Sequence, residues 1–265
     1  MYEDARVSVP EIQRIEAQFR ETINPVASLG FVGLATDRAS LPDFRAFVGD
    51  VDGVEVHATR IPFAPVASPE TLACLIDDVA AGVEMLVPGQ PLGSISFSCT
   101  SGTVAVGEDR LRAEIASVRP GVSSVTPIGA AVDGLRLLGC SRLSLLMPYL
   151  LDTSRMVAGH FEDAGFALDR VSTFDLNGDP EMNCVDPDRI ITAALEIFDP
   201  ESDGLFISCT GWLTRSVIEP LEDALGVPVV TSNQALAWSA LRAAGVIGPL
   251  ANRGQLFCLP TPIVQ

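Results

Sequence analysis

The sequence contains no lysine. All 17 of its basic residues are arginines, against 34 Asp and Glu residues, and the formal net charge is −17. Without lysine the chain cannot form the Schiff base on which ordinary pyridoxal-phosphate enzymes and lysine aldolases depend, nor can it form a P-loop. The negative charge argues against nucleic acids and anionic membrane surfaces as partners.

Long apolar runs and targeting signals are also missing. A typical apolar run, residues 143–151, is interrupted by Pro148 and is far shorter than the ~20 residues that span a bilayer. The first six residues are polar and acidic, without the features of a signal peptide. We therefore expect a cytoplasmic protein with no membrane segment. Its 265 residues, 48% of them hydrophobic, indicate a compact α/β protein of one large or two small domains.

Two further scarcities limit the chemistry. None of the six cysteines has a C-x-x-C or other zinc-ligand spacing, so we expect reduced thiols and no metal. The two histidines, His57 and His160, fall in a predicted edge strand and a predicted outer helix. This placement argues against a Ser-His-Asp or Cys-His site.

The chain contains a repeat centred on two cysteines. Residues 94–102 and 204–212 are both short apolar runs that end in a cysteine, a hydroxyl residue and then small residues. Cys99 and Cys209 are 110 residues apart, and the segments that begin at Gly121 and Gly226 match each other at an offset of 105. We interpret this pattern as a duplicated half. If a pseudo-twofold axis relates the halves, the two thiols face each other across one cleft.

The predicted fold is α/β, with two pseudo-twofold-related lobes, each a parallel β-sheet flanked by helices, and the active site between the lobes. The first lobe is predicted to comprise residues 1–129, completed by residues 233–265, and the second residues 130–232. Helical spacing in residues 1–27 predicts a lead-in helix, whereas residues 36–68 are predicted to form a long loop with one edge strand.

Ligands on parallel sheets bind at the carboxyl ends of the strands, and five candidate residues follow predicted strands. Cys99 and Cys209 are the candidate catalytic pair, with Thr36, Asp37 and Tyr149 lining the cleft. Tyr149 is either a donor to a substrate carboxylate or a packed aromatic. The loop residues Asn177, Asp179 and Asn183 are interpreted mainly as turn-forming.

The residues after each cysteine complete the predicted site. Thr100 and Ser101 follow the first cysteine, and Thr210 and Gly211 follow the second. We expect a helix to begin after each cysteine, so that free N–H groups bind a carboxylate or an enolate oxygen. The same N–H groups are expected to lower the thiol pKa and to permit a thiolate at neutral pH. Such a site requires no metal or cofactor.

Paired thiols of this kind support two reactions. One thiol removes a proton from a small substrate while the other returns a proton on the opposite face. Alternatively, a thiolate adds to a carbon–carbon double bond, and rotation about the resulting single bond isomerises an unsaturated diacid. The sequence leaves both open, together with a decarboxylase that uses Cys209 alone and a small-molecule-binding protein without catalysis.

The cysteine segments resemble the aspartate/glutamate racemase superfamily. The branch is that of maleate cis–trans isomerase, arylmalonate decarboxylase and the Asp/Glu-racemase-like protein of ectoine-utilisation operons. The segments that carry the resemblance are Ser-Asp-Gly-Leu-Phe-Ile-Ser-Cys209-Thr-Gly-Trp-Leu-Thr, Gly226-Val-Pro-Val-Val-Thr-Ser-Asn-Gln and Pro148-Tyr149-Leu-Leu-Asp. The resemblance implies that Cys99 and Cys209 are the catalytic pair, and that Tyr149, Thr100 and Ser101 bind carboxylate.

Two departures from the family patterns matter. The decarboxylases have glycine in place of Cys99, so its presence favours proton shuttling or isomerisation. Maleate isomerases have Pro-Ser-Ser-Asn where this chain has Leu34-Ala35-Thr36-Asp37, and an acid there repels one carboxylate of maleate. The resemblance therefore implies a cofactor-independent racemase or isomerase of a small amino-acid or carboxylate substrate in ectoine or hydroxyectoine degradation. Maleate isomerisation is the alternative, and a homo-oligomer (dimer or tetramer) is expected.

Overall fold

The computed structural model describes residues 11–18 and 26–259. Residues 11–18 are exposed and form neither helix nor strand, so the predicted lead-in helix is wrong for them. Most of the remainder of that predicted helix lies outside the described residues. No helix in the described ranges is both long enough and apolar enough to cross a membrane.

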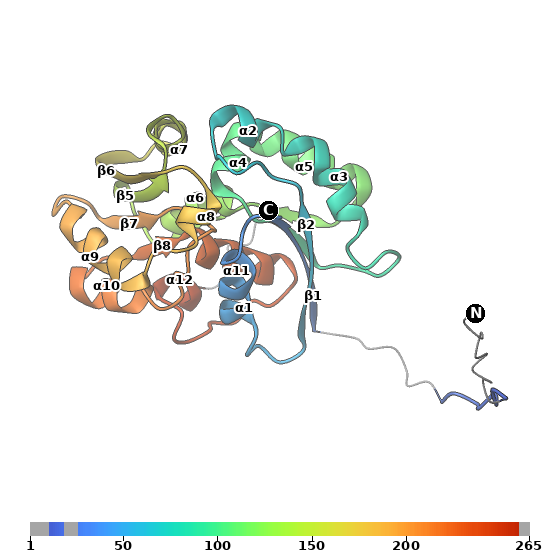
Figure 1. The fold of residues 1–265 in the computed structure, drawn as a ribbon. Coiled ribbons are helices and arrows are strands. Elements are labelled where there is room, and N and C mark those ends of the chain that lie inside the picture. Colours follow the sequence, from blue (N-terminus) through green and yellow to red (C-terminus); the bar gives the residue numbers. More distant parts are fainter. Residues whose placement is uncertain (1–10, 19–25, 260–265) are drawn as a thin grey trace, which may run out of the picture.

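Two four-stranded parallel sheets form the centre of the described chain (Figure 1). The first has the order β2-β1-β3-β4 and the second the order β6-β5-β7-β8, so the same arrangement occurs twice. This confirms the predicted fold class. The strands are β1 (Ala27–Leu34), β2 (Val54–Ile61), β3 (Ser94–Phe97), β4 (Ser123–Val125), β5 (Arg142–Tyr149), β6 (Ala167–Leu176), β7 (Gly204–Ile207) and β8 (Val229–Thr231).

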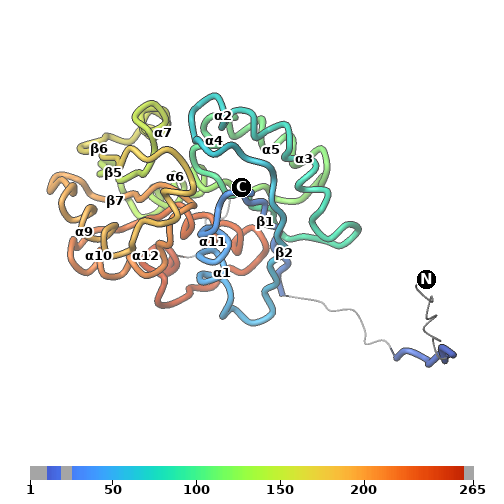
Figure 2. Tube along the Cα trace, viewed as in Figure 1, coloured from blue at the N-terminus to red at the C-terminus, as the bar shows by residue number. Residues whose placement is uncertain are grey.

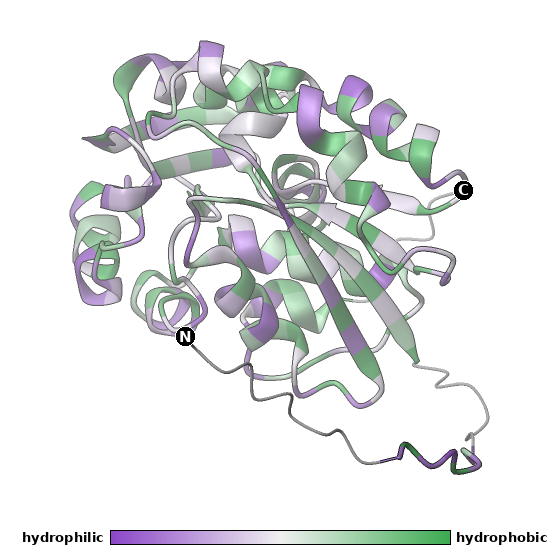
Figure 3. Cartoon of the chain, turned by 45° about the vertical axis from the view of Figure 1, so that its right-hand side comes forward, coloured by the Kyte–Doolittle hydropathy of each residue, from purple (hydrophilic) through white to green (hydrophobic). Residues whose placement is uncertain are grey.

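Helices cover both faces of each sheet. Because of this cover the central strands β3 and β7 are fully buried, as expected for parallel strands, whereas the edge strands β2 and β6 are mostly half-buried. The helices carry alternating hydrophobic and hydrophilic stretches (Figure 3), as expected of amphipathic helices. They are α1 (Ser40–Val48), α2 (Pro69–Ala73), α3 (Ile76–Glu84), α4 (Thr100–Val106), α5 (Glu108–Val118), α6 (Pro127–Leu137), α7 (Leu151–Asp163), α8 (Asp179–Met182), α9 (Pro187–Ile197), α10 (Ile218–Leu225), α11 (Ser232–Ala243) and α12 (Gln255–Cys258).

Helix α11 connects the two sheets. It follows β8 of the second sheet, yet it packs against α1, α6 and β3, and α1 and α11 lie side by side although they are far apart in sequence (Figure 2). Thr231 caps α11 through a capping box with Gln234. Because the chain runs from β8 directly into α11, this helix joins the second sheet to the first. The predicted lobe boundaries stay a prediction.

Three helical segments differ from expectation. Residues 40–48, predicted as loop, form α1. The Ser68-Pro69-Glu70 start and the Gly-rich exit after Cys99 predict single helices near residues 69–85 and 104–118. Each of these segments is two helices instead, and the second pair is divided at Gly107, whose φ is +88°. Glycine adopts this φ at little cost, and the break allows α4 to begin directly at the first cysteine.

Candidate active site

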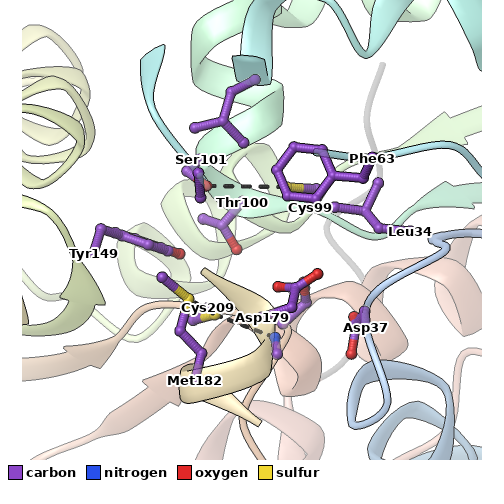
Figure 4. Close-up of a pocket in the computed structure, with 14 residues that line it drawn as sticks. Leu34, Asp37, Phe63, Cys99, Thr100, Ser101, Tyr149, Asp179, Met182 and Cys209 are labelled. Carbon is purple, nitrogen blue, oxygen red and sulfur yellow. Dashed lines mark hydrogen bonds between the residues drawn. The ribbon is translucent and has the colours of Figure 1, made fainter. Parts of the chain in front are cut away.

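Cys99 and Cys209 occupy equivalent positions in the two halves. Cys99 follows β3 and Cys209 follows β7 by two residues, and each of these strands is the third in its half. Both thiols line one small cavity between the sheets (Figure 4). Its interior leaves about 10 Å³ for the centre of a water molecule, close to the minimum that one water needs. Binding of a metabolite therefore requires the cavity to open.

Fourteen residues from both halves line the cavity. Leu34, Phe63, Ala67, Leu72 and Met182 contribute apolar surface, and the remainder are Asp37, Cys99, Thr100, Ser101, Tyr149, Asp179, Cys209, Thr210 and Gly211. No arginine described by the structure lines it, and the chain has no lysine. Across the described ranges no group of three or more His, Cys, Asp or Glu side chains is placed to hold a metal ion.

The Cys99 thiol sits at the start of α4. Its Sγ accepts a hydrogen bond from the Gly102 N–H at 3.3 Å and lies 3.9 Å from the Ser101 Oγ. A Cβ on Gly102 would lie 2.8 Å from this sulfur, so the close approach of the amide requires glycine. The predicted helix start after this cysteine is confirmed.

The Cys209 backbone is strained. Its φ is +113°, a conformation that non-glycine residues rarely adopt and that persists only when the surroundings hold it. The Cys209 N–H donates to the Ser232 Oγ at 3.0 Å, and the Gly211 N–H donates to the cysteine Sγ at 3.2 Å. Contrary to the prediction, no helix begins here, because a turn extends to α10 at Ile218.

Asn233 and Asp43 hold this turn from outside the cavity. The Asn233 Nδ2 donates to the carbonyl oxygens of Thr210 and Trp212 and to the Asp43 Oδ2, at 2.9–3.0 Å. The same carboxylate accepts from the N–H and hydroxyl of Thr214. These donors belong to the second half and to α11, whereas Asp43 lies on α1. The position of Cys209 thus depends on contacts between the two halves.

Burial reverses the expected ionisation of the thiols. Cys99 and Cys209 are 6% and 5% exposed. Burial and the nearby Asp179 carboxylate raise the pKa of Cys99 to about 12 and raise the pKa of Cys209 well above its ordinary value, although each sulfur accepts one N–H bond. The prediction of a lowered thiol pKa is therefore wrong, because desolvation outweighs the amide donors.

Tyr149 ends β5 and points into the cavity (Figure 4). Its hydroxyl lies 3.0 Å from the Ser208 Oγ, and burial raises its pKa well above the ordinary value. The phenol therefore remains protonated, and one hydrogen is available to a ligand or to Ser208.

The other predicted hydroxyl residues tie the halves together. The Thr100 hydroxyl donates to the Ser232 Oγ at 2.8 Å, and the Thr210 hydroxyl donates to the Ser98 carbonyl oxygen at 3.2 Å. Both residues line the cavity, as do Ser101 and Gly211. Thr36 is not one of the lining residues, and its hydroxyl donates instead to Asp179. The roles of Thr36, Thr100, Ser101, Thr210 and Gly211 in substrate binding stay predictions.

The two acidic residues of the cavity differ in what they already bind. The Asp37 Oδ1 accepts from the N–H groups of Ala39 and Ser40 at 2.8 and 3.0 Å, so this carboxylate is already bonded to the backbone where α1 begins. Asp179, at the first position of α8, was missed as a site residue because Gly-Asp-Pro is a strong turn signal. The only sequence indication was its position after a strand.

Asp179 should make stability depend on pH. Burial raises its pKa from 3.8 to about 6; the titratable groups that face it are Asp37, Cys99 and Cys209. The folded protein keeps this proton to higher pH than the unfolded chain, so stability falls as pH rises from about 4 to about 6.

The free energy of unfolding of Asp179→Asn is expected to exceed that of the wild type by about 1–3 kcal/mol at pH 7 and to differ little from it near pH 4. Urea denaturation measures this; Asp223→Asn, on the exposed surface of α10, is the control. An equal difference at both pH values contradicts the prediction.

Comparison with known proteins identifies the group to which this site belongs. The two like α/β halves and the matches below place the chain in the maleate isomerase and arylmalonate decarboxylase branch of the aspartate/glutamate racemase superfamily. Residues 69–257 match the family model described as arylmalonate decarboxylase. The chain belongs to this family.

Individual relatives agree with this assignment. The arylmalonate decarboxylase of Bordetella bronchiseptica is 33% identical over 127 residues, a match that spans 47% of this chain and about half, 53%, of that protein. The maleate isomerase of Nocardia farcinica is 24% identical over 217 residues, covering 76% of this chain and 82% of that protein.

Solved structures of both enzymes have this fold. A cysteine-to-serine mutant of the Nocardia farcinica maleate cis–trans isomerase, with a covalently bound succinylcysteine intermediate, aligns with a TM-score of 0.81 at 22% identity, over 87% of this chain and 97% of that one. A liganded arylmalonate decarboxylase variant, with one glycine changed to cysteine and one cysteine to serine, aligns with a TM-score of 0.78 at 26% identity, over 88% and 99% of the two chains.

Proposed function

We propose that this protein is a cofactor-independent isomerase in which Cys99 and Cys209 act on opposite faces of one small carboxylate substrate. The observation that carries the proposal is that two thiols from equivalent strand ends line a single cavity. Membership of the arylmalonate decarboxylase family supports it. The presence of Cys99, where the family's decarboxylases have glycine, favours isomerisation over decarboxylation by Cys209 alone.

Proton transfer between the two sulfurs accounts for racemisation. One cysteine enters the reaction as thiolate and the other as thiol. The thiolate accepts the proton from the carbon next to the carboxylate, and the thiol donates its own proton to the opposite face, so the negative charge ends on the second sulfur. The N–H groups of Gly102 and Gly211 already point at the sulfurs and stabilise whichever is ionised.

Amino-acid racemisation is the form of this reaction that we favour. Asp37 and Asp179 place acidic groups in the cavity, and these repel a second carboxylate of a substrate. The resemblance to the ectoine-utilisation relative supports an amino-acid intermediate of ectoine or hydroxyectoine breakdown as substrate.

Maleate-type cis–trans isomerisation is the second candidate. Maleate isomerases match most of this chain, and the Nocardia farcinica structure contains a succinylcysteine intermediate. The corresponding reaction here is addition of one thiolate to one carbon of the double bond while the thiol of the other cysteine protonates the neighbouring carbon. After rotation about the resulting carbon–carbon single bond, the same thiolate is eliminated and the second sulfur takes the proton back. If the proton that is added to carbon is the same one that is later removed, this reaction leaves no deuterium on the product in D₂O.

Incubation in D₂O separates these reactions. The purified protein is incubated with small L- and D-amino acids, with maleate and with phenylmalonate, and products are followed by proton NMR and chiral chromatography. Racemisation replaces the α-proton with deuterium in both enantiomers, isomerisation converts maleate to fumarate, and decarboxylation releases CO₂. The absence of all three, with both thiols alkylated by iodoacetamide no faster than an ordinary cysteine, would leave a binding protein without catalysis.

Opening of the cavity involves a segment near Gly178. The Ala67 N–H donates to the Asn177 carbonyl oxygen at 2.8 Å, and the Thr153 hydroxyl donates to the Ala67 carbonyl oxygen at 2.9 Å. These bonds hold the chain after Pro65 against the second half, beside the cavity residues Phe63 and Ala67. We infer that substrate enters when these bonds open.

Gly178→Val is expected to raise KM by about tenfold or more, because misplacement of a closing segment weakens substrate positioning. A Cβ at residue 178 would overlap the Pro65 carbonyl oxygen, so the segment after Pro65 cannot pack in its present position. Steady-state kinetics measure KM, and Gly159→Ala is the control, because a Cβ there contacts nothing within 4 Å. A lower Tm with unchanged KM contradicts this role.

A further inference from the structure

The cavity contains one carboxylate whose partners are incomplete. Asp179 is 7% exposed and lines the cavity with both cysteines (Figure 4). Its Oδ2 accepts the Thr36 hydroxyl. Among the described residues no hydrogen bond or ion pair reaches its Oδ1, which lies on the side of the Cys209 turn, 3.6 Å from where a Cβ on Gly211 would be. This oxygen faces the cavity and is free to accept a hydrogen bond from a ligand.

The other carboxylate of the cavity, Asp37, has more partners within the protein. The Asp37 carboxylate accepts the backbone N–H groups of Ala39 and Ser40 at the start of α1. The Arg60 guanidinium lies beside it and donates to the Asp37 carbonyl oxygen. The Asp37 charge is therefore already compensated in part. Asp179 is the acidic group that remains available to a ligand.

The surroundings select the charge of that ligand group. None of the described lining residues is basic, so nothing in the cavity wall compensates a second substrate carboxylate beside Asp179. A protonated amine in the same place supplies both a donor for Oδ1 and an opposite charge, and Coulomb attraction is strong in a desolvated site.

We propose that Asp179 binds a protonated amine of the substrate, so that the substrate is a small amino acid whose ammonium group lies beside the carbon at which Cys99 and Cys209 exchange protons. This proposal rests on the proposed function. Asp179, on α8, thereby determines the class of substrate, and the hydrogen bond from Thr36 fixes the orientation of its carboxylate.

Amine binding at Asp179 also affects the ionisation of the two thiols. The Asp179 charge is the second-largest cause of the raised pKa of both Cys99 and Cys209. An ammonium group that pairs with Asp179 neutralises this charge, so amine binding lowers the thiol pKa. A substrate without an amine leaves the thiols in their neutral resting form. Selection of the substrate and activation of the thiol are therefore linked through one side chain.

Calorimetric titration tests the subsite without depending on turnover. Two probe pairs are used that differ only in the amine, L-aspartate with succinate and L-alanine with propionate, each titrated at pH 7.5 into wild type, Asp179→Asn and the surface control Asp223→Asn. The wild type and the control are expected to bind the amine-bearing member of at least one pair about tenfold or more tightly than its partner. Asp179→Asn is expected to lose this preference, with affinity for succinate or propionate unchanged or increased.

Three results overturn the assignment. These are equal affinity of the wild type for both members of each pair, equal weakening of both members in Asp179→Asn, and failure of both amine-bearing probes to bind at millimolar concentration. The D₂O exchange experiment tests the proposed catalytic activity independently of the amine subsite. Amine preference without exchange contradicts catalysis but keeps the subsite, whereas exchange that is indifferent to Asp179→Asn contradicts the subsite but keeps catalysis.

Discussion

Replacement of Cys99 or Cys209 with Ala is expected to lower kcat by about 10²–10⁴-fold, the contribution typical of a positioned acid or base. Each thiol serves one face of the substrate, and the described lining of the cavity contains no histidine to take its place. Cys74→Ala is the matched control, because this cysteine is free and exposed. Its activity should remain at the wild-type level.

The single-thiol variants should also differ from each other. If the two sulfurs face opposite sides of the α-carbon, Cys99→Ala retains slow proton exchange with one enantiomer only, and Cys209→Ala with the other. Chiral analysis of deuterium incorporation measures this. Full racemase activity in Cys99→Ala, or exchange of the same enantiomer by both variants, contradicts the two-thiol mechanism.

Asp43→Ala is expected to destabilise the fold by about 3–5 kcal/mol, because it leaves several buried donors without an acceptor, at about 1–3 kcal/mol for each that stays unsatisfied. Asp43 is 3% exposed and accepts from the N–H and hydroxyl of Thr214, the Arg215 N–H and the Asn233 side chain. Urea denaturation measures the free energy of unfolding. The control is Asp52→Ala at an exposed position, where a change within about 0.5 kcal/mol is expected.

The same carboxylate should also affect catalysis. Asp43→Asn keeps the size of the side chain but replaces one acceptor with a donor, so the turn after Cys209 loses part of its support. Because Cys209 has a strained φ of +113°, we expect relaxation of the turn to lower kcat more than it raises KM. Equal kcat in the wild type and Asp43→Asn would show that the network serves stability alone.

The repeated strands were predictable because their signals are local. The runs before Cys99 and Cys209 are continuous apolar segments that end in small polar residues, a pattern that remains visible wherever the segments lie in the fold. Helix α1 was missed because Pro42 indicates a loop. In the structure this proline lies in the first turn of α1, where a missing N–H costs little, and Asp37 accepts the N–H groups of Ala39 and Ser40 where the helix begins.

The amino-acid sequence by itself determined the two parallel α/β halves, the equivalence of the two cysteines and the family. These depend on hydrophobic periodicity and on residues adjacent in the chain. The tertiary structure alone decided that the thiols are buried, which raises the pKa of each, that Asp179 faces them, and that α1 supports the Cys209 turn. Thr36 and Asp179 are 143 residues apart, and Asp43 and Asn233 are 190 residues apart. Such contacts, and the desolvation that sets the pKa of each thiol, arise only when the two halves pack against each other.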